Sequence, residues 1–267
     1  MSKKAICVGI NDYPGSYNDL NGCINDCDDW GSLLGNDFGF EVSQLKDNQA
    51  TASLIKDSLT SMVNEANDGD VLVFTFSGHG TWTYDNHNPD ESDNRDEALC
   101  AYDGNILDDE IRDILKRLTS GARLTVICDS CHSGTSTRSL LRNEQDSNAG
   151  APAVNAPKPR YMPPEDENSA LRTMMIPIRH RAFYPESNMN EVLITGCNSL
   201  EYSYDAYLGG QYNGAMTFNA INIIKNNPTL TYREFHRRLR FLLPTTQFTQ
   251  SPQLEGNSTN KDRVIFS

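Results

Sequence analysis

The chain has 267 residues, of which 37% are hydrophobic, and a formal net charge of −13 at pH 7. A chain of this length can bury a sizeable core, and we expect one large α/β domain rather than two small ones. The acidic balance argues against nucleic acid or an anionic membrane as a partner, and it favours basic peptides or divalent cations.

Apolar runs of strand length alternate along the chain with segments of helical periodicity. We expect strands at 5–10, 41–45, 71–76, 124–128 and 191–195. Helices are expected at 23–34, 51–66 with Thr51 as N-cap, 108–118, 215–225 and 232–242. This alternation predicts a mostly parallel sheet covered by helices on both faces. Catalytic groups in such sheets cluster at the carboxyl ends of the strands.

The regular pattern stops after Gly134 for roughly fifty residues. The segment 135–186 is rich in Pro, Asn, Ser and charged residues, which predicts a mobile linker or insertion. We therefore divide a single domain, 1–267, into a first part at 1–134, this linker, and a second part at 187–267.

The cysteines and the N-terminus bear on the compartment. The N-terminal apolar run is too short for a signal peptide or a membrane span, so we expect a cytoplasmic protein. Seven cysteines without an export signal predict reduced thiols rather than a disulfide framework. Cys7, Cys128 and Cys197 lie in strand-like runs and are expected to be small core residues.

Two of the apolar runs end in a reactive side chain flanked by Gly and Ser. Phe76-Ser-Gly-His-Gly80 ends one run, and Asp129-Ser-Cys-His-Ser-Gly134 ends the other. A thiolate attacks a carbonyl far better than a thiol, so Cys131 needs a base, which can afterwards protonate the leaving amine. His79 can do both, and we predict a catalytic pair. His132 is a competing base, and an inert thiol beside a capped histidine is the structural alternative.

A metal or redox site is a second interpretation of the same block. Cys128 to His132 matches the CxxCH pattern of haem attachment or redox pairs. Covalent haem requires export, and a redox pair belongs at a helix start, whereas Cys128 lies within a predicted strand. Zinc would need further ligands, which Cys23, Cys27 and His79 could supply. We therefore favour the peptidase interpretation.

The chain resembles the caspase-fold cysteine peptidases, and among them the metacaspases and orthocaspases. The matching blocks are 22–26, 77–80, 107–110 and 129–134, and more weakly 194–197 and 214–217. The resemblance implies a caspase-like (caspase-hemoglobinase) α/β fold, with large-subunit-like and small-subunit-like parts at 1–134 and 187–267. It also implies an oxyanion hole made by the backbone amides of Gly80 and Cys131, and a monomer rather than a dimer.

The same resemblance implies a substrate preference. Asp26 and Asp129 would line the primary specificity (S1) pocket, with Ser77 and Cys23 beside them. Two carboxylates in a cleft would hold a guanidinium or ammonium group and reject an acid. We therefore expect an endopeptidase that cleaves after Arg or Lys.

Calcium is a separate question, raised by the acidic residues after His79. By resemblance, Asp96, Asp108 and Asp109 match three calcium ligands of calcium-dependent metacaspases. Arg138 takes the place of the fourth ligand, and a cation there would repel calcium and could instead pair with the acids. We expect no required cofactor, and a weak calcium site and a solvated acidic loop remain alternatives.

The linker offers several basic residues to an Arg/Lys-specific site. We hypothesise self-cleavage there into two fragments that stay associated. The candidate positions are Arg138, Arg142, Lys158, Arg160, Arg172, Arg179 and Arg181. The competing hypotheses are a catalytically weak or inactive interaction module, and a gingipain- or legumain-like peptidase of related fold.

Overall fold

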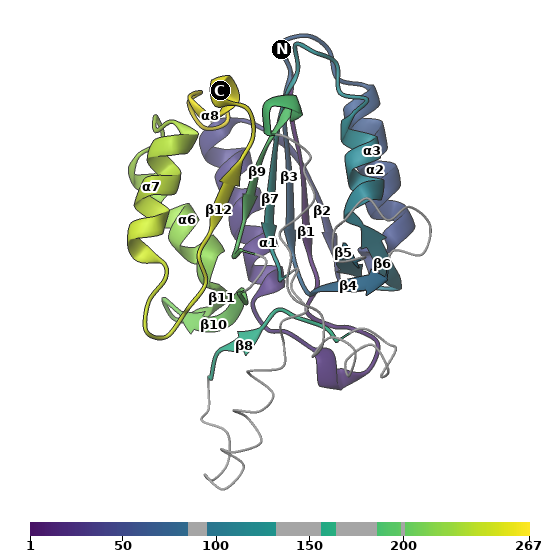
Figure 1. Ribbon diagram of the computed structural model, residues 1–267, viewed down its shortest axis with the longest axis vertical. Coiled ribbons are helices and arrows are strands. Elements are labelled where there is room, and N and C mark those ends of the chain that lie inside the picture. The colour runs from purple at the N-terminus through teal and green to yellow at the C-terminus, as the bar shows by residue number, and fades with distance from the viewer. Residues whose placement is uncertain (85–94, 132–155, 164–185, 199–200) are drawn as a thin grey trace, which may run out of the picture.

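The fold is built on a six-stranded sheet at the centre of the molecule (Figure 1). The computed structural model describes residues 1–84, 95–131, 156–163, 186–198 and 201–267. The strand order is β12-β9-β7-β3-β1-β2; β12 is antiparallel to β9, and the other neighbours are parallel. The strands are β1 (Lys3–Gly9), β2 (Glu41–Lys46), β3 (Val71–Ser77), β7 (Arg123–Asp129), β9 (Glu191–Thr195) and β12 (Gln253–Glu255). The predicted, mostly parallel sheet is confirmed.

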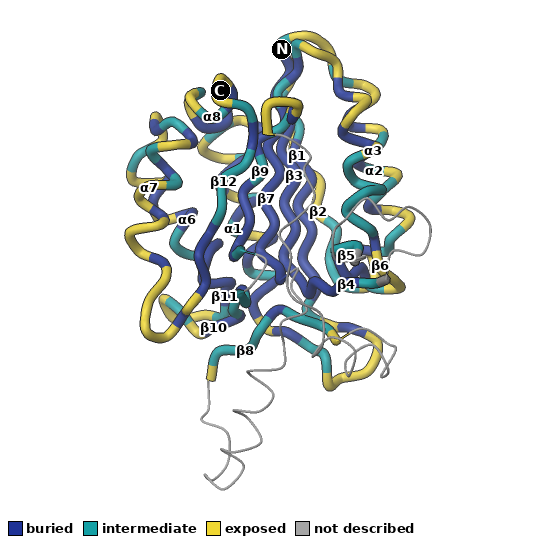
Figure 2. Tube along the Cα trace, in the orientation of Figure 1, coloured by how far each residue is buried: buried dark blue, intermediate teal, exposed yellow. Residues whose placement is uncertain are grey.

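Helices cover both faces of this sheet (Figure 1). On one face lie α1 (Cys23–Ser32), α6 (Ala215–Asn226) and α7 (Tyr232–Leu242), and on the other α2 (Ala52–Asn64) and α3 (Asp108–Leu115). Side chains of β1 alternate between the two cores: Ala5 and Cys7 pack in one, and Ile6 and Val8 in the other. Figure 2 shows the central strands buried along almost their whole length, as this two-sided packing requires.

The predicted elements agree with the observed ones except near some ends. Thr51 is the N-cap of α2, with its side chain accepting the Leu54 N–H at 3.2 Å. The first helix passes into a π-helical turn at Leu33–Asp37, and α3 ends at Leu115 rather than at 118. Short 3-10 turns lie at Ser16–Asn18, Asp47–Gln49 and Glu186–Asn188, and α8 at Ser258–Lys261.

Two small antiparallel sheets were not predicted. One joins β4 (Gly80–Tyr84), β5 (Arg95–Ala101) and β6 (Gly104–Leu107), and the other joins β8 (Lys158–Pro159), β10 (Tyr204–Leu208) and β11 (Gln211–Gly214). Their strands are two to seven residues long and lack the long apolar runs that mark the central strands. Both sheets lie near the carboxyl ends of the parallel strands, where they flank the candidate site (Figure 1).

The two halves of the chain share one sheet. β1, β2, β3 and β7 come from the first part, and β9 and β12 from the second. In the described part of the chain, no helix is both long and apolar enough to cross a lipid bilayer.

Candidate active site

His79 and Cys131 follow neighbouring strands of the central sheet. β3 pairs with β7 in parallel, with Ser77 opposite Asp129, so both chains leave the sheet at the same edge. Each residue lies two positions beyond this pair, and both are buried. The structure therefore places the two residues expected to carry the chemistry at the same edge of the sheet, just beyond neighbouring strands.

The imidazole of His79 has a defined orientation. Its Nε2 lies 2.7 Å from the backbone carbonyl oxygen of Asn18, which can only accept, so Nε2 carries the proton and Nδ1 is the basic nitrogen. Nδ1 is buried and has no hydrogen-bond partner among the described residues. Burial lowers the pKa of His79 to about 4. The charges of Lys158 and Arg160 lower it further, whereas interactions with the backbone carbonyls of Asn18 and Arg160 oppose the shift. The ring is therefore neutral at pH 7, and its unprotonated nitrogen can accept a proton.

Tyr13 holds His79 from the other side. Its hydroxyl accepts the backbone N–H of His79 at 2.8 Å and donates to the Cys100 carbonyl at 3.2 Å, and its ring lies 4.9 Å from the imidazole. Tyr13 and Asn18 precede α1 and belong to no motif, so the sequence analysis did not identify either of them as site residues.

The sulfur of Cys131 is fully buried and contacts the backbone of Ser203. It accepts the Ser203 N–H at 2.8 Å and lies 3.3 Å from the Ser203 carbonyl oxygen. A side-chain hydrogen bond also links Cys131 to Cys197, and with burial it raises the pKa of Cys197. Among the described residues, no hydrogen bond joins the sulfur directly to His79.

Two backbone amides converge on one carbonyl oxygen beside the sulfur. The N–H groups of Gly80 and Cys131 donate to the Arg160 carbonyl oxygen at 3.0 and 3.2 Å. Gly80 approaches Cys131 so closely that a Cβ at Gly80 would lie 1.8 Å from the Cys131 carbonyl oxygen. These are the two amides that the resemblance assigned to an oxyanion hole.

The guanidinium of Arg160 fills an acidic pocket formed by Asp26, Asp129 and Asp205. Nη2 lies 2.6 Å from Asp26 and 3.1 Å from Asp205, and Nη1 lies 3.4 Å from the Asp129 carboxylate and donates to the Asp129 carbonyl at 3.0 Å. All four side chains are at most 1% exposed. Burial raises the pKa of Asp26 to about 6, although the charge of Arg160 opposes this shift.

Backbone donors hold these carboxylates independently of Arg160. Asp26 accepts the Gly214 N–H at 2.9 Å, and Asp129 accepts the N–H and hydroxyl of Thr217 at 2.9 and 2.8 Å. Asp205 accepts the backbone N–H groups of Asn21 and Gly22 at 2.8 and 2.9 Å. Asn21 and Gly22 lie just before α1. The acidic pocket is thus preorganised by the fold.

Sequence analysis identified Asp26 and Asp129 but missed Asp205. Asp205 lies in the short strand β10 and belongs to no motif. Asp26 and Asp205 are far apart in the chain, and only the fold brings both carboxylates to Arg160. Cys23 is buried in the first turn of α1, where the charge of Arg160 acts on it, and Ser77 is buried at the end of β3.

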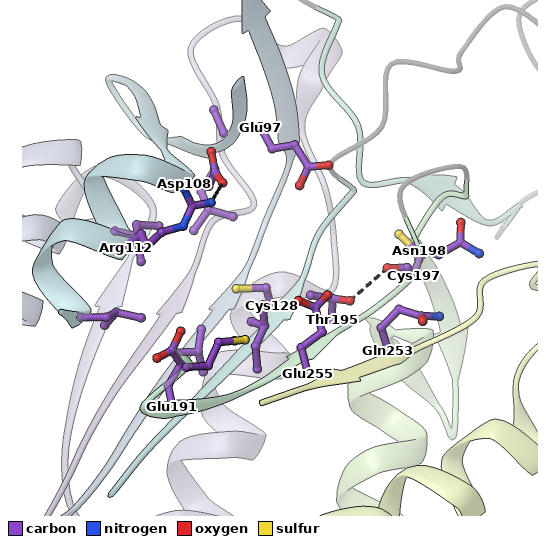
Figure 3. Close-up of a pocket in the computed structure, with 17 residues that line it drawn as sticks. Glu97, Asp108, Arg112, Cys128, Glu191, Thr195, Cys197, Asn198, Gln253 and Glu255 are labelled. Carbon is purple, nitrogen blue, oxygen red and sulfur yellow. Dashed lines mark hydrogen bonds and ion pairs between the residues drawn. The ribbon is translucent and has the colours of Figure 1, made fainter. Parts of the chain in front are cut away.

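The candidate calcium ligands lie on β5 and in the first turn of α3, and two of them are engaged in ion pairs. Arg112 forms ion pairs with Asp108 at 2.6 Å and with Asp109, a pairing expected instead from Arg138. Asp108 faces a cavity of about 280 Å³ that Glu97, Glu191 and Glu255 also line, on the sheet face beside β9 and β12 (Figure 3). Asp96 lies on β5 opposite Thr83 of β4. Among the described residues, no three metal-ligating side chains form a cluster fit for an ion.

Within the described part of the chain, which excludes His132, the cysteines form neither a disulfide nor a metal cluster. All seven cysteines are buried free thiols. Cys128 belongs to the core cluster that includes residues of β3 and α2 and also lines the cavity of Figure 3, and Cys27 donates to the Cys7 carbonyl at 3.3 Å. Several candidates lie outside the described residues: His132, Arg138, Arg142, Arg172, Arg179 and Arg181. Lys158 and Arg160 lie inside them.

Comparison of sequences identifies the family. The family model "Metacaspase, peptidase C14 domain" matches residues 3–139. Metacaspase-1 of Debaryomyces hansenii is 33% identical, over 94% of this chain and 64% of that protein. Metacaspase-1 of Scheffersomyces stipitis is 31% identical, over 99% of this chain and 73% of that protein. The chain belongs to the metacaspases, a family of cysteine-type peptidases, and spans about two thirds of the length of these relatives.

Solved structures agree on the fold. A protein from Geobacter sulfurreducens superposes with a TM-score of 0.73 at 24% identity, covering 100% of this chain and 99% of that one. Caspase-1 from Spodoptera frugiperda superposes with a TM-score of 0.58 at 9% identity, covering 96% of this chain and 88% of that one. The expected caspase-like fold is therefore confirmed.

Proposed function

We propose that the protein is an endopeptidase that cleaves after Arg or Lys, with Cys131 as nucleophile and His79 as general base and acid. One observation carries this proposal: Arg160 sits in the acidic pocket while its own carbonyl oxygen binds the amides of Gly80 and Cys131. A basic side chain and the carbonyl that follows it therefore occupy the places that a substrate residue would take before the scissile bond.

Acyl transfer accounts for the remaining groups. His79 Nδ1 would take the thiol proton, the Cys131 sulfur would attack the carbonyl carbon, and the two amides would hold the oxyanion. His79 would then protonate the leaving amine, and water would release the acyl group from sulfur. The Asn18 carbonyl and Tyr13 position the ring through this cycle.

The pocket geometry favours Arg over Lys. The two terminal nitrogens of a guanidinium reach Asp26, Asp205 and Asp129 together, whereas a lysine offers a single charged nitrogen. An acidic side chain would bring a fourth negative charge beside three buried carboxylates and would be excluded.

Every group in this scheme comes from the polypeptide, so we propose that turnover needs no bound metal. Arg112 neutralises two of the candidate calcium ligands, and calcium would have to displace it. We further propose that the partners are basic peptides or proteins, with neither nucleic acid nor membrane involved. The protein would act in the cytoplasm as a monomer, and it would cleave its own chain within 135–186.

Hydrolysis of fluorogenic peptides tests the proposal. We expect release from peptides ending in Arg, weaker release from Lys peptides, and none from Asp peptides, with the same rates in chelator and in added calcium. Cys131→Ala and His79→Ala should each abolish release. Hydrolysis that survives Cys131→Ala, or that prefers Asp peptides, would contradict the proposal.

A further inference from the structure

We propose that Gln250 is a positioning residue of the active site, whose side-chain amide holds Ser203 so that the Ser203 backbone faces both the nucleophile and the substrate. Gln250 belongs to no motif and lies in the loop between α7 and β12, where it is fully buried. This inference rests on the proposed function. It adds a residue that touches neither the substrate nor the reacting atoms.

Ser203 presents three different groups to the site. Its N–H donates to the Cys131 sulfur at 2.8 Å, and its carbonyl accepts the backbone N–H of Arg160 at 2.9 Å. Its hydroxyl donates to the Asp129 carboxylate on the wall of the acidic pocket. A displacement of this one residue would therefore disturb the sulfur, the bound main chain and a pocket acid together.

Gln250 ties Ser203 to the central sheet. Its Nε2 donates to the Gly196 carbonyl at 2.8 Å and to the Ser203 hydroxyl at 3.3 Å, and its Oε1 accepts the Tyr204 N–H at 3.2 Å. Gly196 directly follows β9, and its N–H donates to the Cys128 carbonyl of β7 at 2.8 Å. A single amide therefore joins the end of β9 to the start of β10.

The orientation of this amide follows from its partners. The Gly196 carbonyl can only accept and the Tyr204 N–H can only donate, so the amide nitrogen faces the former and the amide oxygen the latter. The same nitrogen donates to the Ser203 hydroxyl, whose proton is then directed to Asp129. Gln250 thereby sets the direction of the hydrogen bond that reaches the pocket.

The end of β9 packs closely against Ser203. A Cβ at Gly196 would lie 2.6 Å from the Ser203 hydroxyl oxygen and 2.8 Å from the Asp129 carboxylate, so only glycine allows this approach. The position of Ser203 therefore depends on the hydrogen bonds that Gln250 makes to both segments.

The loop that carries Gln250 is held by other contacts. The Ser251 N–H donates to the Glu201 carboxylate at 2.5 Å, and the Pro252 carbonyl oxygen lies 2.9 Å from Nε2 of His236 on α7. A change confined to the side chain of Gln250 should therefore leave the loop in place.

Two chemical consequences follow from the position of Ser203. A hydrogen bond to sulfur favours the thiolate over the thiol, so the Ser203 N–H should speed the reactions of Cys131 near neutral pH. The Ser203 carbonyl should hold a substrate through the N–H of the residue before the scissile bond, as it holds Arg160.

A pair of substrates tests the second consequence. Gln250→Leu removes the amide, and Gln247→Leu is the matched control, because that side chain is exposed in the same loop. We compare an Arg peptide with the same peptide methylated on the backbone nitrogen of its arginine. Methylation should lower kcat/KM at least ~10-fold in the wild type and the control. In Gln250→Leu, kcat/KM for the unmethylated peptide should already be ~10-fold lower, and the loss on methylation at least ~3-fold smaller. Losses that multiply independently would overturn the inference, because a merely structural residue would not couple to the substrate N–H.

Alkylation of Cys131 by iodoacetamide, followed by mass spectrometry, gives a readout that needs no turnover. At pH 7, Gln250→Leu should react at least ~3-fold more slowly than the wild type and the control, and the rates should converge near about pH 10, where the thiol ionises without help. Equal or faster alkylation at pH 7 would overturn the inference, since a loosened fold exposes the sulfur at every pH.

Thermal unfolding establishes that each variant folds. Gln250→Glu, which keeps an oxygen for the Tyr204 N–H but has no N–H to donate, replaces Gln250→Leu if the latter does not fold. A wild type that hydrolyses no basic peptide would overturn the proposed function, and the alkylation rates would then decide the role of Gln250 by themselves.

Discussion

The Arg160 guanidinium lies 2.6 Å from the Asp26 carboxylate, and both side chains are fully buried although 134 positions separate them in the chain. A buried charge is costly unless it is paired and hydrogen bonded. Here the ion pair places a linker residue in the pocket that is proposed to receive substrate. The proposed substrate preference can therefore be tested by substituting the acidic residues of the pocket one at a time.

Asp205 is the pocket acid to test first, because no motif marks it. In the processed enzyme, Asp205→Asn should lower kcat/KM for an Arg peptide by roughly 10- to 100-fold, the equivalent of one charge-assisted hydrogen bond of about 1.5–3 kcal/mol. The amide oxygen can still accept from Asn21 or Gly22, so the pocket should keep its shape. Asp262→Asn is the matched control, since that carboxylate is 60% exposed and pairs with Arg233. Equal effects of the two substitutions would exclude Asp205 from the pocket.

The backbone at Gly80 gives a second prediction. Gly80→Ala should lower kcat at least ~100-fold, because the new Cβ would clash with the Cys131 carbonyl and displace a proposed oxyanion donor. Gly104→Ala is the control, since a Cβ there meets nothing within 4 Å. Single-turnover kinetics of the two variants check this, and full activity of Gly80→Ala would rule out the proposed role of this amide.

Sequence patterns identified the parts of the fold that are determined by a few consecutive residues. The apolar run Val71–Ser77 and the motif around Cys131 were recognisable because a buried parallel strand and the segment that follows its carboxyl end each occupy a few consecutive residues. β10 and β8 are only five and two residues long, and β8 pairs with a strand more than forty positions away in the chain. Asp205 and the occupation of the pocket by Arg160 depend on that pairing, so neither could be derived from residue spacing.

Tyr13 should prove to be a positioning residue rather than a catalytic one. Tyr13→Phe removes the hydroxyl that accepts the His79 N–H and donates to Cys100, which leaves a buried donor unsatisfied at about 1–3 kcal/mol. We expect kcat to fall roughly 10-fold with little change in KM, and the pH profile of kcat to shift as the imidazole loses its fixed position. A change confined to thermal stability, with kcat and its pH profile intact, would reduce Tyr13 to a structural role.

His79 and Asp26 should give opposite pH dependences of stability, measured in the uncut Cys131→Ala chain. Burial lowers the pKa of His79 from 6.5 to about 4, so the unfolded state binds more protons across that window and the contribution of His79 is lost as pH falls. Burial raises the pKa of Asp26 from 3.8 to about 6, so the folded state binds more protons there and stability rises as pH falls through 6. Each contribution amounts to at most roughly 3 kcal/mol.

Substitution of either group should therefore expose the pH dependence of the other. Relative to the Cys131→Ala parent, His79→Gln should gain stability between pH 6.5 and 4.5, and Asp26→Asn should lose stability over the same range. Urea unfolding at pH 7, 5.5 and 4.5 gives the free energies, and differences between chains remove the contribution of the other carboxylates, which all of them share. Curves that run parallel at all three pH values would mean that neither group changes its protonation in the way its burial implies.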